Sequence, residues 1–495
     1  MDTNCNNYRW IGENMMKLSV LAKTSSSFRY PELVAYKSQV KSIYLIVMLL
    51  VIVLSIIGIQ NKLYLKTDLL TVYIMYIILG LSNVIVTQKG ITWDKIVGWS
   101  FFAYSVGVPL YLLTDGGLEG FIGTKMYFNE VYTFATVSES LYYNCLFVSL
   151  FYFSYFIFNK KVSENLEENT VNGTSLTNKK YNYFHSRFFI HYWILIAVGL
   201  FLFGMYKINY LSAISAGYSL KNVGYVYLFT AVFAIDIGTL ILFRMTNFEK
   251  KYLLIAGIFH LLLFPLGIRQ LTFTFIFQLA LLYKLANYQR KIKVKGIILG
   301  ISLLLFFGLI GMVRKGGEQA FSFISLLKAP IRYFFYETTF NYISFLKCLE
   351  LFKEHSISYL YGKTLLDPIV EQIPSFILSN KNNYQFFERF IMQYESLENL
   401  KPVGTAHLLT ELYVNGGMIF VIIFSLIIGL VSSILNNKLW KVIATNNFIG
   451  QILFSAIIPF VFIQLNRGGL SVLTKLSFQF AILPVLIVLM FRRKI

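Results

Sequence analysis

The sequence predicts an all-α polytopic membrane protein with about twelve transmembrane helices and both termini in the cytoplasm. Apolar residues make up 56% of its 495 residues and charged residues only 14%, whereas a soluble domain averages about 25% charged residues. Uncharged apolar runs such as residues 44–59 recur along the chain, and roughly 20 such residues in a helix cross the hydrocarbon core of a bilayer. Basic residues gather in alternate loops. Together these observations exclude a water-soluble enzyme.

The expected spans follow the apolar runs, because a backbone in lipid satisfies its polar groups only within a helix or a closed barrel. Their bounds are 42–60, 67–86, 96–114, 139–158, 187–206, 223–243, 252–267, 270–287, 296–313, 413–435, 446–464 and 472–491. The first run is long and follows a polar segment, so we expect an uncleaved first span.

The positive residues of short loops set the orientation. With the N-terminus inside, basic clusters such as Lys160–Lys161 and Arg492–Lys494 lie in the cytoplasm, and the acidic segment 115–138 lies outside. We therefore interpret the net charge of +20 mainly as the result of basic residues in the cytoplasmic loops. It is scattered over loops and forms no single basic face, so nucleic acid is not an expected partner.

The expected organisation has five parts. They are a cytoplasmic segment 1–41, nine spans over 42–313, a large outer loop 314–404, three spans over 405–491 and a cytoplasmic end 492–495. The five histidines are scattered, without paired CxxC, HExxH, P-loop or GxGxxG sequences. The sequence therefore predicts neither a metal site nor a cofactor, and no nucleotide-driven pump.

The outer loop 314–404 is the main departure from a plain helix bundle, since loops of this length are usually functional or form a small domain. Apolar residues recur at helical spacing between 331 and 352, which predicts an amphipathic helix. A second stripe consists of Glu337, Asn341, Ser344 and Cys348. The helix either lies on the membrane with a solvated polar face or forms a lid whose polar stripe faces a substrate.

Isolated cations stand at the expected outer ends of the spans. They are Arg269, Arg314, Arg332 and Arg467. Charges near membrane depth are costly and tend to face a cavity or a partner, although long side chains also extend to lipid headgroups. Arginine binds phosphates and carboxylates with two parallel hydrogen bonds. Several arginines converging on one outer pocket would suit a diphosphate or an acidic sugar.

His407 precedes the span where the long loop re-enters the membrane, and Glu411 follows one helical turn later. Both side chains could line one face of that helix, and an imidazole beside a carboxylate can act as a general base. The alternative is a structural or interfacial histidine. Asp236 and His260 lie within expected spans, and we expect them to be interhelical hydrogen-bond partners.

Four stretches resemble the Wzy-type O-antigen or capsule polysaccharide polymerases, which are relatives of the O-antigen ligases. They are GIRQLTFTFIFQLALL (267–282), RYFFYETTFNYISF (332–345), GKTLLDPIVEQIPSFILSNKN (362–382) and GTAHLLTELYVNGGMIFVIIFSLIIGL (404–430). The resemblance covers the topology of most of the chain and the local sequence over about 260–430. The arginine-and-glycine motif of some polymerases is not clearly present.

The resemblance implies a GT-C-type glycosyltransferase in the bacterial plasma (inner) membrane. Such an enzyme moves a growing chain from its undecaprenyl-diphosphate carrier onto a newly flipped, lipid-linked repeat unit at the outer face. Arg269 matches the short-turn arginine that the family places near the diphosphate, and His407 resembles a histidine of the related ligases. The implied partners are undecaprenyl-diphosphate-linked oligosaccharides, the lipid bilayer, a flippase and a chain-length regulator.

The expected reaction is inverting and metal-independent, without a covalent intermediate. The departing diphosphate needs its charge stabilised, which Arg269, Arg314, Arg332 and Arg467 could do together with Glu411 as a further substrate-binding residue. The attacking hydroxyl needs a base, for which the candidates are His407 and Glu337. The alternative functions are a lipid-linked oligosaccharide flippase, which has no need for the long outer loop, and an O-antigen ligase.

Overall fold

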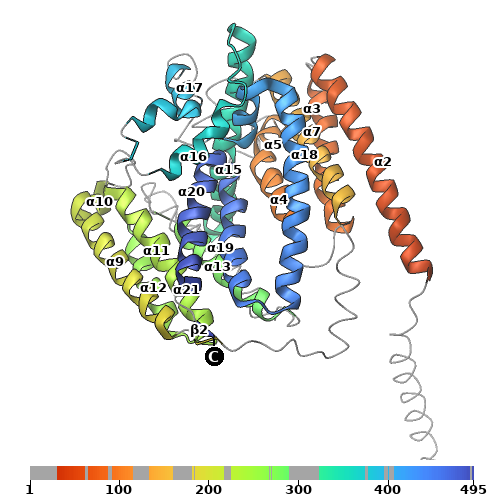
Figure 1. Ribbon diagram of the computed structural model, residues 1–495. Helices are drawn as coiled ribbons and strands as arrows, with labels where there is room; N and C mark the ends of the chain where they lie inside the picture. Colours follow the sequence, from red (N-terminus) through yellow and green to blue (C-terminus); the bar gives the residue numbers. More distant parts are fainter. Residues whose placement is uncertain are drawn as a thin grey trace, which may run out of the picture.

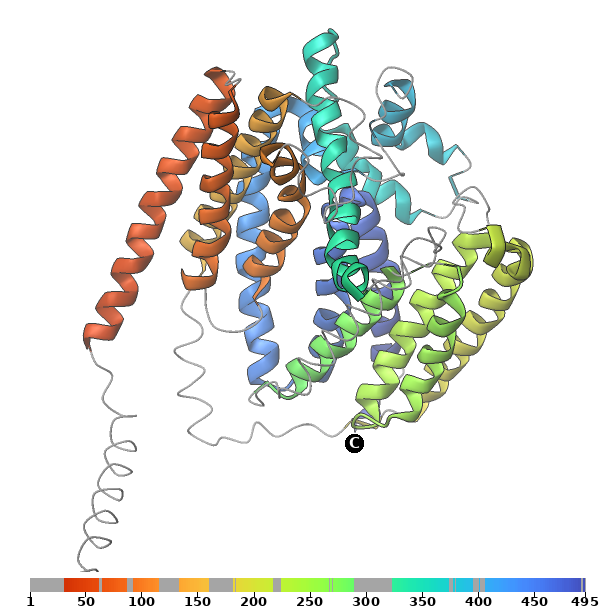
Figure 2. The same ribbon diagram turned by 180° about the vertical axis from the view of Figure 1, so that it is seen from behind.

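The computed structural model is a bundle of long helices, shown in Figure 1 and from behind in Figure 2. The residues it describes are 31–61, 65–86, 92–114, 133–159, 181–182, 184–216, 224–266, 268, 270–288, 323–373, 377–378, 380–394, 400, 406–490 and 493–494.

One group of helices packs around a first hydrophobic core. Its members are α2 (Pro31–Asn61), α3 (Lys66–Val86), α4 (Trp93–Ser105), α5 (Gly107–Leu113), α7 (Phe134–Phe158), α15 (Phe323–Glu354) and α18 (Leu408–Ala444). Helix α7 lies at the centre of this group, between α2, α3 and α18. Its side chains from Thr136 to Phe156 are almost all buried. A helix that is apolar all round and buried is expected in the middle of a bundle.

A second group packs around a separate hydrophobic core. Its members are α9 (Phe184–Ile208), α10 (Tyr210–Ala216), α11 (Gly224–Met245), α12 (Lys251–Leu263), α13 (Gln270–Ala286), α19 (Phe448–Gln464) and α21 (Leu483–Met490). Helices α13 and α19 contribute to both cores, since Leu281 and Ile458 belong to the first and Leu282 and Phe460 to the second. These two helices therefore join the groups.

The remaining elements lie in the upper half of the bundle as drawn in Figure 1. They are η2 (Lys363–Leu366), α16 (Asp367–Gln372), η3 (Lys381–Tyr384), α17 (Phe386–Tyr394) and the first turns of α20 (Gly469–Ser477), which continues through a π-helical turn (Phe478–Ile482) into α21. We call residues 355–373 and 380–394 the outer segment. A third, small apolar core anchors it through Phe390, Ile391 and Cys348.

Eleven of the twelve expected spans coincide with helices, and the twelfth, 296–313, lies outside the described residues. Within the described part of the chain, seven helices or helix pairs are long and apolar enough to cross a membrane: Ser42–Asn61, Trp93–Leu113, Phe134–Phe158, Ser186–Ile208, Gly224–Met245, Leu408–Ala444 and Gly469–Met490. The class of multi-pass helical membrane protein is thereby confirmed. The total of twelve spans stays a prediction.

Two short strands connect segments far apart in the chain at the end opposite the outer segment. Strand β1 (Tyr181–Asn182) pairs antiparallel with β2 (Arg493–Lys494), so that Tyr181 lies opposite Lys494. The start of α2 lies towards this same end in Figures 1 and 2. Both ends of the described chain therefore lie at one end of the bundle, and their location in the cytoplasm stays a prediction.

Helix α15 covers the stretch 331–352 that the apolar stripe predicts as helix, and it begins earlier, at Phe323. It stands beside α4, α7 and α18 along the bundle. Asn341, Ser344 and Cys348 of the polar stripe are fully buried. These three residues therefore face the protein interior, which argues against a helix with a solvated polar face, and the lid stays a prediction.

Helix α18 is interrupted at Gly416 and Gly417, eight residues after it begins. Gly417 has φ +59° and ψ −141°, a conformation that is essentially restricted to glycine. The backbone N–H groups of Leu360 and Tyr361 donate to the carbonyls of Val414 and Asn415, at 3.0 and 2.8 Å. The interruption therefore provides the acceptors that dock the outer segment onto α18.

We predict that Gly417→Ala destabilises the protein by about 1–3 kcal/mol, the range expected for a side chain forced into this conformation. An added Cβ would also lie 2.8 Å from the Tyr359 hydroxyl. The measurement is the thermal midpoint of the purified protein in detergent. Gly257→Ala on α12 is the matched control, because nothing lies within 4 Å of its added Cβ. Equal midpoints for the two variants would contradict the prediction.

Candidate functional site

The Glu411 carboxylate joins three segments at the end of the bundle that carries the outer segment. It lies on the first turn of α18 and is 2% exposed. One oxygen accepts from the Thr364 hydroxyl of η2 at 3.2 Å, and the other accepts from the backbone N–H of Leu470 at 2.9 Å. A carboxylate at a helix N-terminus is favoured by the unpaired N–H groups there. Glu411 therefore ties α18 to both η2 and α20.

Two further features bring α18, η2 and α20 into close contact. Gly469 has φ +69°, and a Cβ at this position would lie 2.6 Å from the second Glu411 oxygen. Asn415, one turn after Glu411, donates to the Thr364 hydroxyl at 2.6 Å and to the Glu411 carbonyl at 2.7 Å. All of these polar groups are buried, so their mutual hydrogen bonds hold the segments in one arrangement.

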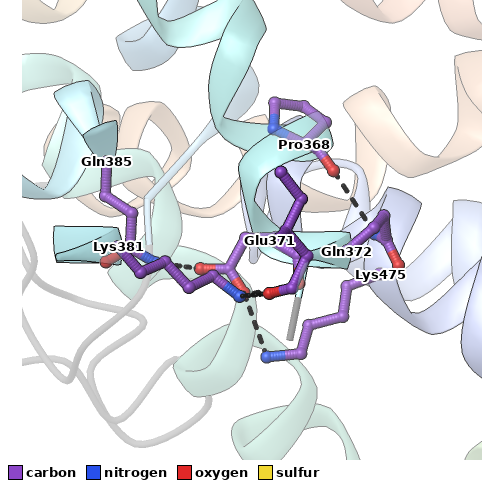
Figure 3. Close-up of polar contacts among 7 residues, drawn as sticks. Pro368, Glu371, Gln372, Lys381, Gln385 and Lys475 are labelled. Atoms are coloured by element: carbon purple, nitrogen blue, oxygen red, sulfur yellow. Dashed lines mark hydrogen bonds and ion pairs between the residues drawn. The ribbon is translucent and has the colours of Figure 1, made fainter. Parts of the chain in front are cut away.

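A charged cluster lies nearby, where α16 packs beside α20 (Figure 3). Glu371 of α16 forms an ion pair with Lys475 of α20 at 3.1 Å and lies 3.9 Å from the ammonium of Lys381. Lys381 also donates to the carbonyls of Glu371 and Ile373, and the Gln385 amide donates to the Glu371 carboxylate. The cluster joins α16, η3 and α20 and carries two positive charges against one negative charge.

Asp367 orients α17 from the start of α16. Its two carboxylate oxygens accept from the backbone N–H groups of Phe386 and Phe387, at 2.9 and 2.8 Å, and these residues begin α17. Burial raises the pKa of Asp367, and the two N–H donors oppose that shift. The carboxylate thus takes the role of a helix cap, although it lies about twenty residues before the helix it caps.

His407 is the N-cap of α18 and is fully buried. Its Nδ1 accepts from the backbone N–H of Leu409 at 3.2 Å, so the neutral ring carries its proton on Nε2. The rings of Phe101, Tyr342 and Phe345 surround it at centroid distances of 5.5, 5.9 and 6.3 Å. Within the described part of the chain, Nε2 has no hydrogen-bond partner. In this conformation the His407 ring can donate a hydrogen bond from Nε2–H. Its one basic lone pair, on Nδ1, accepts the capping hydrogen bond from Leu409.

The polar stripe of α15 positions the start of α18. The Ser344 hydroxyl accepts from the backbone N–H of His407 at 2.8 Å and lies 2.9 Å from the Thr410 hydroxyl. On the other side, the N–H of Ala406 donates to the carbonyl of Arg467 at 3.2 Å. The turn that carries Arg467 therefore lies directly beside the residue before His407.

The sequence-predicted residues fall into two sets. The structure places His407, Glu411 and Arg467 at the same end of the bundle, with Arg467 half-buried. His407 and Glu411 contact different elements, namely α4 and α15 for His407 and η2 and α20 for Glu411. The expectation that both side chains line one face of α18 stays a prediction. The remaining residues, Arg269, Arg314, Arg332 and Glu337, have side chains outside the described part of the structure.

Sequence reasoning did not select Glu371, Lys381, Thr364 or Asn415 as site residues. The first three belong to the stretch 362–382, which drew notice only for its family resemblance. A polar residue at every third or fourth position of 364–371, in a segment next to the membrane, is the signal that marks them.

The expected interhelical pairing of Asp236 and His260 is confirmed. Their side chains are 2.9 Å apart, and His260 also lies 3.0 Å from the Thr272 hydroxyl. These contacts link α11, α12 and α13 within the second core. Among the described residues, no three His, Cys, Asp or Glu side chains gather in a way that could hold a metal ion.

The fold and this charged, hydrogen-bonded end define a multi-pass membrane protein with a polar site at one end of its bundle. The family model of the O-antigen polysaccharide polymerase Wzy matches residues 43–495. The chain therefore belongs to the Wzy family of O-antigen polymerases, which act on lipid-linked oligosaccharide repeat units in the membrane. No curated protein and no solved structure matches the chain.

Two substitutions separate the roles of the two nitrogens of His407. Asparagine at this position keeps the helix cap and removes the Nε2 donor, whereas glutamine places an amide near Nε2 and weakens the cap. We predict that His407→Asn loses polymer formation at a normal membrane level, and that His407→Gln keeps part of it. The measurement is the ladder of surface polysaccharide normalised to the amount of protein. Full activity of His407→Asn would show that only the cap matters.

Proposed function

We propose that the chain joins undecaprenyl-diphosphate-linked oligosaccharide repeat units into a surface polysaccharide at the outer face of the bacterial plasma membrane. The match of the Wzy family model over residues 43–495 is the observation that carries this proposal. The outer segment, held on α18 and α20 by the bonds of Glu411 and Glu371, supports the location of the site at that end.

The first chemical task is to stabilise the departing diphosphate. Preorganised cationic donors do this without reorganising during the reaction. Arg467 and Lys475 stand at the outer end, and the Lys475 side chain is 43% exposed. We propose that Arg467 acts there together with Arg269, Arg314 and Arg332, so that transfer needs no metal ion. The GT-C class of the enzyme belongs to the same proposal.

The second task is to remove the proton of the attacking hydroxyl. Of the two candidates, Glu337 suits this role better, because the cap at Leu409 occupies the basic lone pair of the neutral His407 ring. Glu337 lies on α15 two helical turns before Ser344, which contacts the His407 backbone. His407 would then donate from Nε2 to a sugar oxygen. Direct attack on the anomeric carbon inverts its configuration without a covalent intermediate.

Deletion of the gene tests the activity. We predict that a deletion strain carries a single repeat unit on its acceptor, because flipping and ligation continue without polymerisation. The measurement is gel electrophoresis of the surface polysaccharide, with the wild-type gene on a plasmid as control. An unchanged ladder would contradict the proposal. A complete lack of repeat units would indicate a flippase, and polymer that accumulates on the lipid carrier would indicate a ligase.

Charge-removing variants in the deletion strain test the diphosphate contacts. We predict that Arg269→Ala and Arg467→Ala each lower the polymerisation rate by about 100-fold, the usual cost of losing one donor to a developing negative charge. Arg389→Ala on α17 is the matched control, because its side chain is exposed and donates only to the Asn383 carbonyl among the described residues. A normal ladder at equal protein level in either variant would remove that arginine from the site.

A further inference from the structure

Residues 361–373 of the outer segment have the opposite polarity from a water-exposed loop. Their fully buried side chains are polar, with Thr364 0% and Asp367 3% exposed. Leu366 and Ile369, in contrast, are 50% and 61% exposed. A surface segment in water normally buries its apolar side chains and solvates the polar ones. The outward face of this segment therefore fits an apolar environment.

The inward polar groups do not need water. Thr364 is bonded to Glu411 and Asn415, and Asp367 accepts from two backbone N–H groups. Glu371 is bonded to Lys381, Gln385 and Lys475. A segment in contact with lipid must satisfy its polar groups within the protein. Thr364, Asp367 and Glu371 meet that condition. The half-buried Gln372 donates to the Pro368 carbonyl at 3.4 Å, and its Oε1 has no hydrogen-bond partner among the described residues.

The outward face also continues a surface that faces lipid. Helix α16 packs on α20, and the two lie side by side in Figure 1. Helix α20 belongs to the apolar span Gly469–Met490, whose Val472, Phe478 and Leu486 side chains are at least two-fifths exposed. Exposed apolar side chains on such a span contact acyl chains. The exposed Ile369 lies on α16, the helix that packs on α20, and the exposed Leu366 ends η2 just before it.

We propose that residues 361–373 lie in the outer interfacial layer of the bilayer, with Leu366 and Ile369 in contact with lipid. Tyr361 and Lys363, both exposed at the start of the segment, are residue types that anchor at the boundary between lipid and water. Part of the expected outer loop 314–404 is thus a membrane-contacting element. This proposal rests on polarity and continuity and is independent of the reaction.

Site-directed fluorescence tests the proposal. The full chain carries Cys5→Ser and one new cysteine, either Leu366→Cys or Ile369→Cys. The new cysteine is labelled with an environment-sensitive nitrobenzoxadiazole dye. Cys145 and Cys348 are kept because they are buried. Val472→Cys serves as the lipid-facing control, and Ser356→Cys, exposed after the end of α15, serves as the water-facing control. Each protein is placed in lipid nanodiscs. Quenching by doxyl-labelled phosphatidylcholine and by aqueous iodide is then measured.

We expect the lipid quencher to act on the labels at 366 and 369 about as strongly as on the label at 472. Iodide quenching should be roughly threefold weaker than at 356, as for side chains buried in the headgroup and acyl boundary. Iodide quenching equal to that at 356 would overturn the proposal. Protection from both quenchers would also overturn it, because the face would then be covered by protein.

Discussion

The hydrogen bonds of the buried Glu411 carboxylate hold together the end of the bundle that carries the outer segment. Its two oxygens take donors from η2 and from the first turn of α20, while its own helix is interrupted a few residues later at Gly416 and Gly417. A buried carboxylate is tolerated only where hydrogen bonds or opposite charges compensate its lost hydration. The short first part of α18, the turn at Arg467 and the outer segment therefore depend on one another.

The same end receives support from both hydrophobic cores. Helix α18 belongs to the first core, whereas α20 continues into α21 of the second. The outer segment contacts both through Glu411 and Lys475. The bonds of Glu411 and Lys475 therefore tie elements of the two helix groups together at this end.

Much of the fold could be predicted from the sequence, because apolar runs in a membrane protein mark helices directly. The stripe at 331–352 predicted α15, and the polar groups Asp236 and His260 predicted their own pairing, since each needs a partner at membrane depth. The contacts of the site were harder to predict. Thr364 and Glu411 are 47 residues apart in the sequence, and no periodicity connects two such positions.

Two local features could also not be predicted from the sequence, for physical reasons. The glycine pair at 416–417 lies within an apolar run, where hydropathy indicates one continuous helix, yet Gly417 takes a conformation that breaks it. The inverted polarity of η2 and α16 looks like an ordinary amphipathic pattern until the partners of its polar side are known. Periodicity identifies two faces of a helix. It does not show which of them faces the protein.

Polymerisation by the purified chain tests the account most directly. The chain in nanodiscs is given undecaprenyl-diphosphate-linked repeat units, and product length is followed over time. The Glu411→Gln variant is assayed in the same way, because it replaces one of the two buried acceptor oxygens by an amide donor. We predict polymer from the wild-type chain and at least about tenfold less from Glu411→Gln at equal folded protein, as expected when a buried bond to a charged group is lost. Repeat units left single by the wild-type chain, or full activity of Glu411→Gln, would contradict this prediction.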